Sequence, residues 1–312
     1  MERSPDQPLD LFSTLLMILV CAIWGGAFVA IKIGLKDMPP LGSAALRFFI
    51  TMLVLWVWAR TQHVPLLYPT RETRVLGVIA FLFCCFNLML YLGTARTTSG
   101  RATVFFYSQP AFLAILAHYF IPGDSLTLRK GCGLVLAMVG LIMLFLDKLN
   151  IGHSPTVLGD LLVLSGALAT AVQNLTIKRA AGKIHPVAII FWGTVMTALL
   201  LGIGWWEFEQ TLRFVLSSRS VISVLYLSFV SAAVGFVVFA WLLQRYSASR
   251  VTSLVFLAPV FGLLFSWFIL GETLTGVQFL GVAGVCVGVY IVSSSGIQQV
   301  RAPLSQEASA EV

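Results

Sequence analysis

Two small sets of polar side chains recur at helical spacing inside otherwise apolar stretches of the sequence. The sets are Asn87, Tyr91 and Thr94, and Thr170, Gln173 and Asn174. Separations of three and four residues place the members of a set on one face of a helix. Amide, phenol and hydroxyl groups form neutral hydrogen bonds, so these faces are suited to binding a small polar solute. Hydrogen bonding between packed helices is the alternative role.

Two prolines lie at matching places in the two halves of the sequence. Pro110 and Pro259 each fall near the centre of an apolar stretch, where proline frees the carbonyl four residues earlier, at Phe106 and Val255. Helices interrupted at matching positions point towards a binding site, although a kink that merely shapes a bundle is an equally good interpretation. With flanking and aromatic residues, the predicted substrate site comprises Trp24, Asn87, Tyr91, Tyr107, Pro110, Gln173, Asn174, Ser253, Phe256 and Pro259.

Charged residues lie at the ends of the apolar stretches. All 13 acidic residues lie at stretch ends, in links or in terminal segments, which argues against a carboxylate proton relay. Arg47 lies inside a stretch, where we favour a structural role over attraction of an anionic solute group. Asp124 and Glu272 precede stretches in matching links and are expected to cap helix starts. The stretches offer no nucleophile with its base, no metal-ligand cluster and no carboxylate pair, so we expect neither an enzyme nor a cofactor.

Helices that cross a bilayer must carry these residues. With 58% hydrophobic and 11% charged residues, and a mean hydropathy of +0.93, the chain has too few charges for a water-soluble surface. Each apolar run is about as long as a bilayer crossing and must be helical, because backbone groups in hydrocarbon have to bond internally. The runs are 11–31, 38–59, 75–95, 102–123, 131–146, 161–177, 184–206, 220–244, 251–271 and 273–300. We therefore predict an all-α integral membrane protein with ten transmembrane helices.

The basic residues predict how these helices are oriented. If the N-terminus is cytoplasmic, the inner links hold 12 of the 20 Lys and Arg residues and the outer links hold 7. Cytoplasmic links are enriched in Lys and Arg, so both termini are predicted to be cytoplasmic in a multi-pass protein of the inner or plasma membrane. The net charge of +7 is spread over these links without a large basic cluster, so nucleic acid is not an expected partner.

The sequence also contains an internal repeat. Residues 99–145 and 248–292 share a pattern in which Arg101 matches Arg250 and Pro110 matches Pro259, and their glycines also match. The period of about 147 residues corresponds to five helices, and an odd number means that equivalent helices cross the membrane in opposite directions. Inverted repeats are a recurring feature of secondary transporters. The predicted segments are a cytoplasmic segment 1–10, repeats 11–147 and 157–295, and a disordered cytoplasmic tail 296–312.

Several motifs give the chain a family resemblance. The motifs are Trp24-Gly25-Gly26, Arg47-Phe48, Pro259, Gly271-Glu272-Thr273-Leu274 and the glycines from Gly281 to Gly288. They resemble the EamA-type branch of the drug/metabolite transporter superfamily over nearly the whole chain. The first half departs from the pattern, because Gly123-Asp124 replaces the expected Gly-Glu. The resemblance implies ten helices and export of small metabolites, often amino acids or their derivatives.

The sequence thus predicts a secondary transporter that exports a small organic metabolite by alternating access. A receptor or structural subunit of the membrane that moves no solute is the alternative. The expected partners are the solute and the lipid bilayer. Small-residue faces around Gly133 and Gly140, and around Gly284 and Gly288, either meet within one chain or pair two chains into a homodimer.

Overall fold

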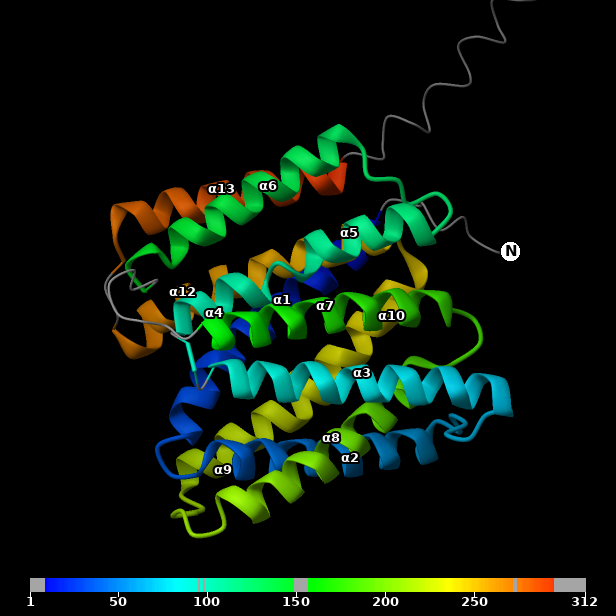
Figure 1. Cartoon of the computed structure of the whole chain (residues 1–312), viewed down its shortest axis with the longest axis vertical. Coiled ribbons are helices and arrows are strands. Elements are labelled where there is room, and N and C mark those ends of the chain that lie inside the picture. The colour runs from blue at the N-terminus through cyan, green and yellow to red at the C-terminus, as the bar shows by residue number, and fades with distance from the viewer. Residues whose placement is uncertain (1–8, 95, 98, 149–156, 272–273, 295–312) are drawn as a thin grey trace, which may run out of the picture.

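The computed structural model describes residues 9–94, 96–97, 99–148, 157–271 and 274–294, which form a bundle of long helices (Figure 1). The elements of the first half are α1 (Leu11–Gly34), α2 (Pro40–Thr61), α3 (Thr70–Thr94), α4 (Ser99–Phe106), α5 (Gln109–Phe120), α6 (Leu128–Leu144) and the short η1 (Leu146–Lys148). Those of the second half are α7 (Val157–Arg179), α8 (Pro186–Phe208), α9 (Ser218–Leu225), η2 (Tyr226–Phe236), α10 (Val237–Arg245), α11 (Ala248–Ser253), η3 (Leu254–Phe256), α12 (Leu257–Leu270) and α13 (Gly276–Ser294).

Local sequence signals set the ends of many helices. Side chains of Asp10, Thr127 and Ser217 accept hydrogen bonds from backbone N–H groups in the first turns of α1, α6 and α9. Prolines occupy the first turns of α2 and α8, where a missing N–H costs nothing. Gly271 ends α12 in the left-handed conformation, at φ 68°, which glycine adopts without strain.

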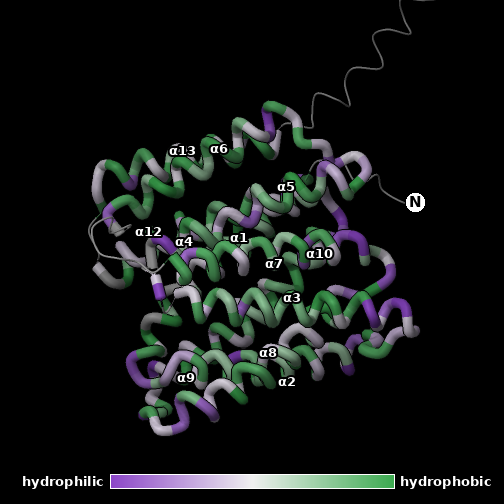
Figure 2. The backbone as a smooth tube through the Cα atoms, in the orientation of Figure 1, coloured by the Kyte–Doolittle hydropathy of each residue, from purple (hydrophilic) through white to green (hydrophobic). Residues whose placement is uncertain are grey.

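The bundle has the polarity pattern of a membrane protein. Hydrophilic residues gather at the two ends of the helices, and the stretches between are mostly hydrophobic (Figure 2). Within the described residues, eight helices are long and apolar enough to cross a membrane. Two further crossings fall short of that length, because α6 has 17 residues and a break divides α4 from α5. The membrane character is confirmed, and the exact count of ten stays a prediction.

Helix contacts repeat between the two halves as an approximate two-fold axis requires. In the first half, α3 packs on α7 of the second; in the second half, the continuous helical stretch α9–η2–α10, which is equivalent to α3, packs on α1 of the first. Similarly, α1 packs on α12, and its equivalent α7 packs on α4 and α5. In two cases a helix packs directly on its equivalent in the other half: α2 on α8, and α6 on α13. Both ends of the described chain lie at the same end of the bundle (Figure 1), as an even number of crossings requires.

The small-residue faces of α6 and α13 meet within the chain. A Cβ added to Gly140 would lie 2.6 Å from the backbone nitrogen of Val285, and one added to Gly288 would lie 2.6 Å from the carbonyl oxygen of Gly133. Glycine is therefore required for the two backbones to approach this closely. Of the two arrangements considered for these faces, the structure has the one within a single chain.

The helices are interrupted near both prolines. The run 102–123, predicted as one helix, is divided between Phe106 and Gln109, and the amide of Ser108 bonds the carbonyl of Phe105 instead of continuing the α-helix. In the second half the chain stays helical but tightens to a 3₁₀ turn over Leu254–Phe256, just before Pro259. Matching interruptions are thus present: the first lies two to three residues before Pro110, and the second three to five residues before Pro259.

Candidate functional site

A chain of aromatic rings runs through the middle of the bundle and joins helices from both halves. Neighbouring ring centroids lie 5.1 to 6.2 Å apart, a normal distance for aromatic packing. We call this set the aromatic cluster: Trp24, Phe48, Phe83, Phe86, Phe106 and Phe236. It brings together α1, α2, α3, α4 and η2. Phe48, Phe83 and Phe86 are buried in a hydrophobic core cluster, and Phe106 and Phe236 pack against it.

Trp24 lies at one end of the cluster, against an unusual helix. The indole nitrogen donates to the carbonyl oxygen of Ser231 at 3.2 Å, within the π-helical stretch η2. A Cβ on Gly235 would approach that nitrogen to 2.9 Å, so the contact requires a small residue there. π-Helical segments are rare and occur frequently at functional sites.

The predicted polar face of α3 only partly turns inward. Asn87 is buried, and its amide nitrogen donates to the carbonyl oxygen of Phe83, one turn earlier, at 2.7 Å. Tyr91 is half-buried beside the aromatic cluster and within electrostatic range of Arg47 and Glu209. Thr94 is exposed and bonds its own helix.

The predicted polar face of α7 is buried throughout. Thr170, Gln173 and Asn174 are each less than 10% exposed. Thr170 bonds the carbonyl of Gly166 at 2.9 Å, whereas the side-chain oxygen of Gln173 is buried without a hydrogen-bond partner among the described residues. A buried acceptor without a partner is costly.

The residues around the prolines are core residues. Tyr107, Ser253 and Phe256 are buried, as are Pro110 and Pro259. The hydroxyl of Ser253 donates to the carbonyl of Arg250 at 2.8 Å. Tyr107 and Phe256 belong to the main hydrophobic core, while Tyr91 packs on a smaller, separate cluster around Phe48 and Phe83.

Two cavities of the structure lie away from these residues. One, of about 370 Å³, lies between α3 and α8 and includes Leu66 and Trp192 in its lining. The other, of about 280 Å³, lies between the ends of α5, α7 and α10 and includes Phe120, Lys178 and Arg245.

Two polar links between the halves were not found from the sequence. Asp124 is fully buried, pairs with the Lys130 ammonium at 3.0 Å, and accepts from the Ser249 amide and hydroxyl at 3.0 and 2.5 Å. Thr127, not Asp124, caps α6, so the expectation that Asp124 caps the following helix is wrong; it binds the first turn of α11 instead. Glu272 lies outside the described residues.

The environment of Asp124 keeps the carboxyl ionised. Burial alone would raise its pKa, but the Lys130 charge and the hydrogen bonds from Ser249 outweigh burial and hold the pKa below its usual value. The second link lies at the opposite end of the bundle, where Arg101 of α4 pairs with Asp160 of α7 and Thr97 donates to the same carboxylate at 2.6 Å. Matching a repeat shows which residues are equivalent, but it does not reveal such pairs across halves.

A comparison with protein families decides the identity of this architecture. The profile of the EamA-like transporter family matches twice, over residues 11–146 and 157–294. The chain belongs to the EamA-like transporter family. The resemblance inferred from the sequence motifs is confirmed, and so is the prediction that the chain is a transporter and not an enzyme.

Relatives of this EamA-family chain carry transporter names. A protein of Escherichia coli (strain K12) called "Probable amino-acid metabolite efflux pump" is 31% identical over 88% of this chain and 93% of its own length. "Uncharacterized transporter YoaV" of Bacillus subtilis (strain 168) is 28% identical over 88% of this chain and 94% of its own. A crystal structure of another protein, 20% identical, superimposes with a TM-score of 0.78 over 93% of this chain and 98% of its own, which shows the fold alone.

Proposed function

We propose that this chain exports a small organic metabolite, an amino acid or a related solute, across the plasma membrane by alternating access of its two halves. The halves are inverted copies, and their helix contacts repeat around an approximate two-fold axis. Two similar halves that rock about a central site are a recurrent means of alternating access. This pairing of the helices is the observation that carries the proposal.

The substrate class is supported by relatives. The Escherichia coli and Salmonella typhimurium relatives, each 31% identical to this chain, are both called amino-acid metabolite efflux pumps. Neutral polar groups next to aromatic rings, as with Asn87 and Tyr91 beside Phe83 and Phe86, suit a small solute with polar and apolar parts. The ten residues predicted from the sequence remain the proposed lining of the path.

The proposed orientation places both termini in the cytoplasm. It rests on the distribution of Lys and Arg residues and on both described ends lying at one end of the bundle. A reporter fused after Val312 should give a cytoplasmic signal. An external signal would refute this orientation.

The function can be tested by counterflow in proteoliposomes. Vesicles loaded with an unlabelled amino acid should accumulate the labelled form when they contain the protein, and protein-free vesicles should not. Cysteines introduced singly at Asn87, Tyr91, Gln173 and Asn174 should react with water-soluble reagents in at least one state of the cycle. Absence of flux for a wide panel of amino acids and derivatives, with folded protein, would favour a receptor or structural subunit instead.

A further inference from the structure

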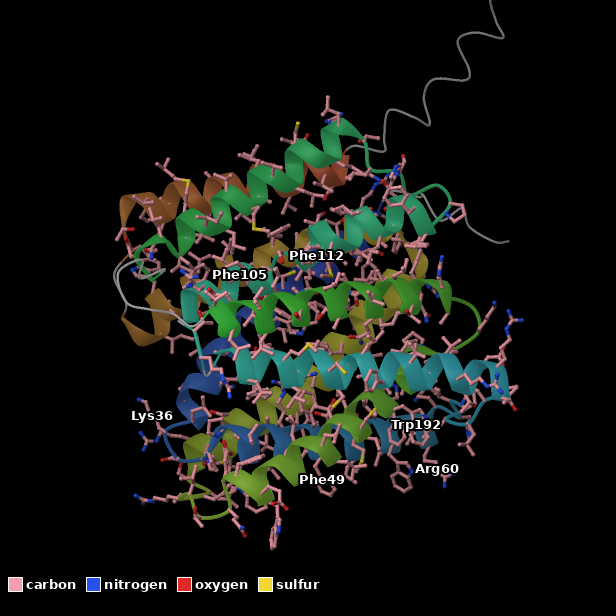
Figure 3. The ribbon with its side chains drawn as sticks, viewed as in Figure 1. Lys36, Phe49, Arg60, Phe105, Phe112 and Trp192 are labelled. Carbon is pink, nitrogen blue, oxygen red and sulfur yellow. The ribbon has the colours of Figure 1, made fainter. Side chains whose placement is uncertain are left out.

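Arg47 lies on the part of α2 that faces the bundle. It follows Pro40, the first residue of the helix, by seven positions, which is about 10 Å along the axis. Its neighbours one turn away, Ala44 and Thr51, are at most 2% exposed. Phe49, on the opposite side of the helix, is 49% exposed and points outward (Figure 3). The arginine is therefore directed towards other helices and not towards lipid.

The guanidinium group has no polar partner among the residues that the structure describes. Its Nε atom is buried without a hydrogen bond, and the closest aromatic contact is the Phe48 ring, with Cζ 4.9 Å from the ring centroid. Glu209, the acid within electrostatic range of the neighbouring Tyr91, accepts from the backbone amides of Leu41 and Gly42 at 2.8 and 3.1 Å. Glu209 thus caps α2 and does not neutralise Arg47.

A charged side chain inside a membrane bundle is costly unless an opposite charge meets it. In soluble proteins and membranes alike, buried arginines are found paired, since the guanidinium fork binds carboxylate and phosphate groups in a bidentate manner. The Arg47 guanidinium binds no such anionic group among the described residues, and the residue is only partly buried. The missing counter-charge is thus expected to come from outside the chain.

The surroundings of Arg47 limit what that anion is. The half-buried Tyr91 lies within electrostatic range, and Phe48 and Phe83 of the aromatic cluster pack beside it. A single cation next to apolar rings matches a monoanion with an apolar body, whereas a phosphate dianion would leave one charge unmatched. We propose that Arg47 binds the carboxylate of the transported solute, with Tyr91 as a neighbouring hydrogen-bond donor. This inference rests on the proposed export function.

The test compares free amino acids with their amides, which differ only in the carboxylate. Binding is measured with purified protein in nanodiscs and flux by proteoliposome counterflow, for leucine and phenylalanine and for their amides. Wild-type protein should prefer each acid over its amide. Arg47→Gln should weaken binding of the acids about 10- to 100-fold, as loss of a charge-assisted bond predicts, and should change binding of the amides less than about 2-fold. Arg60→Gln, at the exposed end of the same helix, is the matched control and should behave as wild type.

A second variant separates recognition from a structural role. Arg47→Met removes the unpaired charge and keeps much of the side-chain volume, so the Tm of the solute-free protein should rise. A fall in that Tm, or an equal loss of acids and amides in Arg47→Gln, would show that Arg47 holds the bundle together and would overturn the inference. Equal wild-type affinity for acids and amides would overturn it as well, while leaving the export function intact. No flux of any compound would instead refute the proposed function and this inference with it.

Discussion

Removing the Asp124 carboxylate should destabilise the protein, because this group is fully buried and takes part in a salt bridge. Asp124→Asn would leave the Lys130 ammonium, whose side chain is only 4% exposed, without its counter-ion, and would weaken both contacts to Ser249. Breaking a buried pair by removing one partner costs about 3–5 kcal/mol. We expect the lower end of this range, because Lys130 keeps the carbonyl of Ser125 at 2.9 Å.

The assay is thermal unfolding of the purified protein at neutral pH. At roughly 2 °C per kcal/mol, a loss of about 3 kcal/mol lowers the Tm by about 6 °C. Asp147→Asn, which changes an exposed acid, is the control and should alter stability by less than about 0.5 kcal/mol. Adding Lys130→Met to Asp124→Asn should recover part of the loss, because the double variant leaves no buried charge unpaired. If Asp124→Asn unfolds at the same temperature as Asp147→Asn, the buried pair does not stabilise the fold and the reasoning is wrong.

Three further outcomes follow from single contacts. Gly140→Ala should lower the Tm, because the new Cβ would lie 2.6 Å from the α13 backbone. Gly77→Ala, whose Cβ would meet nothing within 4 Å, should instead stabilise the protein by about 0.5–1 kcal/mol. A higher Tm for Gly140→Ala than for Gly77→Ala would contradict the close packing of α6 on α13. Partial burial lowers the pKa of His185 in the folded protein, and the neutral ring accepts a hydrogen bond from the amide of Val187 at 3.2 Å. As the pH falls, the unfolded chain therefore binds a proton at this residue before the folded protein does. The stability of the fold should decrease as the pH drops below about 6.5. Comparing the Tm at pH 7.5 and 5.5 for wild type and His185→Asn measures this, and an unchanged pH dependence in the variant would refute it. Because the pKa of Asp124 is lowered in the folded protein, its contribution to stability should persist until the pH falls below about 4 and then be lost as the carboxyl is protonated. A loss of stability near pH 6 that occurs in wild type but not in Asp124→Asn would contradict this assignment.

The apolar runs and the internal repeat predicted most of the helical architecture, because both can be recognised from the sequence without knowledge of tertiary contacts. A bilayer allows a long uncharged run little besides a helix, and the equivalence of Gly140 and Gly288 pointed to small faces that do meet. The π-helical stretch η2 carried no such local signal. It depends on a tertiary contact, in which the Trp24 indole reaches the Ser231 carbonyl past Gly235. The pairing of Asp124 with Ser249 was missed for the same reason, since 125 residues separate them.

The two polar links between the halves constrain how the protein can cycle. Asp124 with Ser249 joins the halves at the end of the bundle where the described chain begins and finishes, and Arg101 with Asp160 joins them at the opposite end. Under the proposed mechanism, the halves separate at one end of the bundle at a time, so the link at the opening end should break while the other holds. The links differ in a way that suits unequal opening: Asp124 is fully buried with three polar contacts, whereas the Arg101 side chain is 25% exposed and water can replace its partner more readily. The end that carries Arg101 should therefore open at lower cost in the absence of solute.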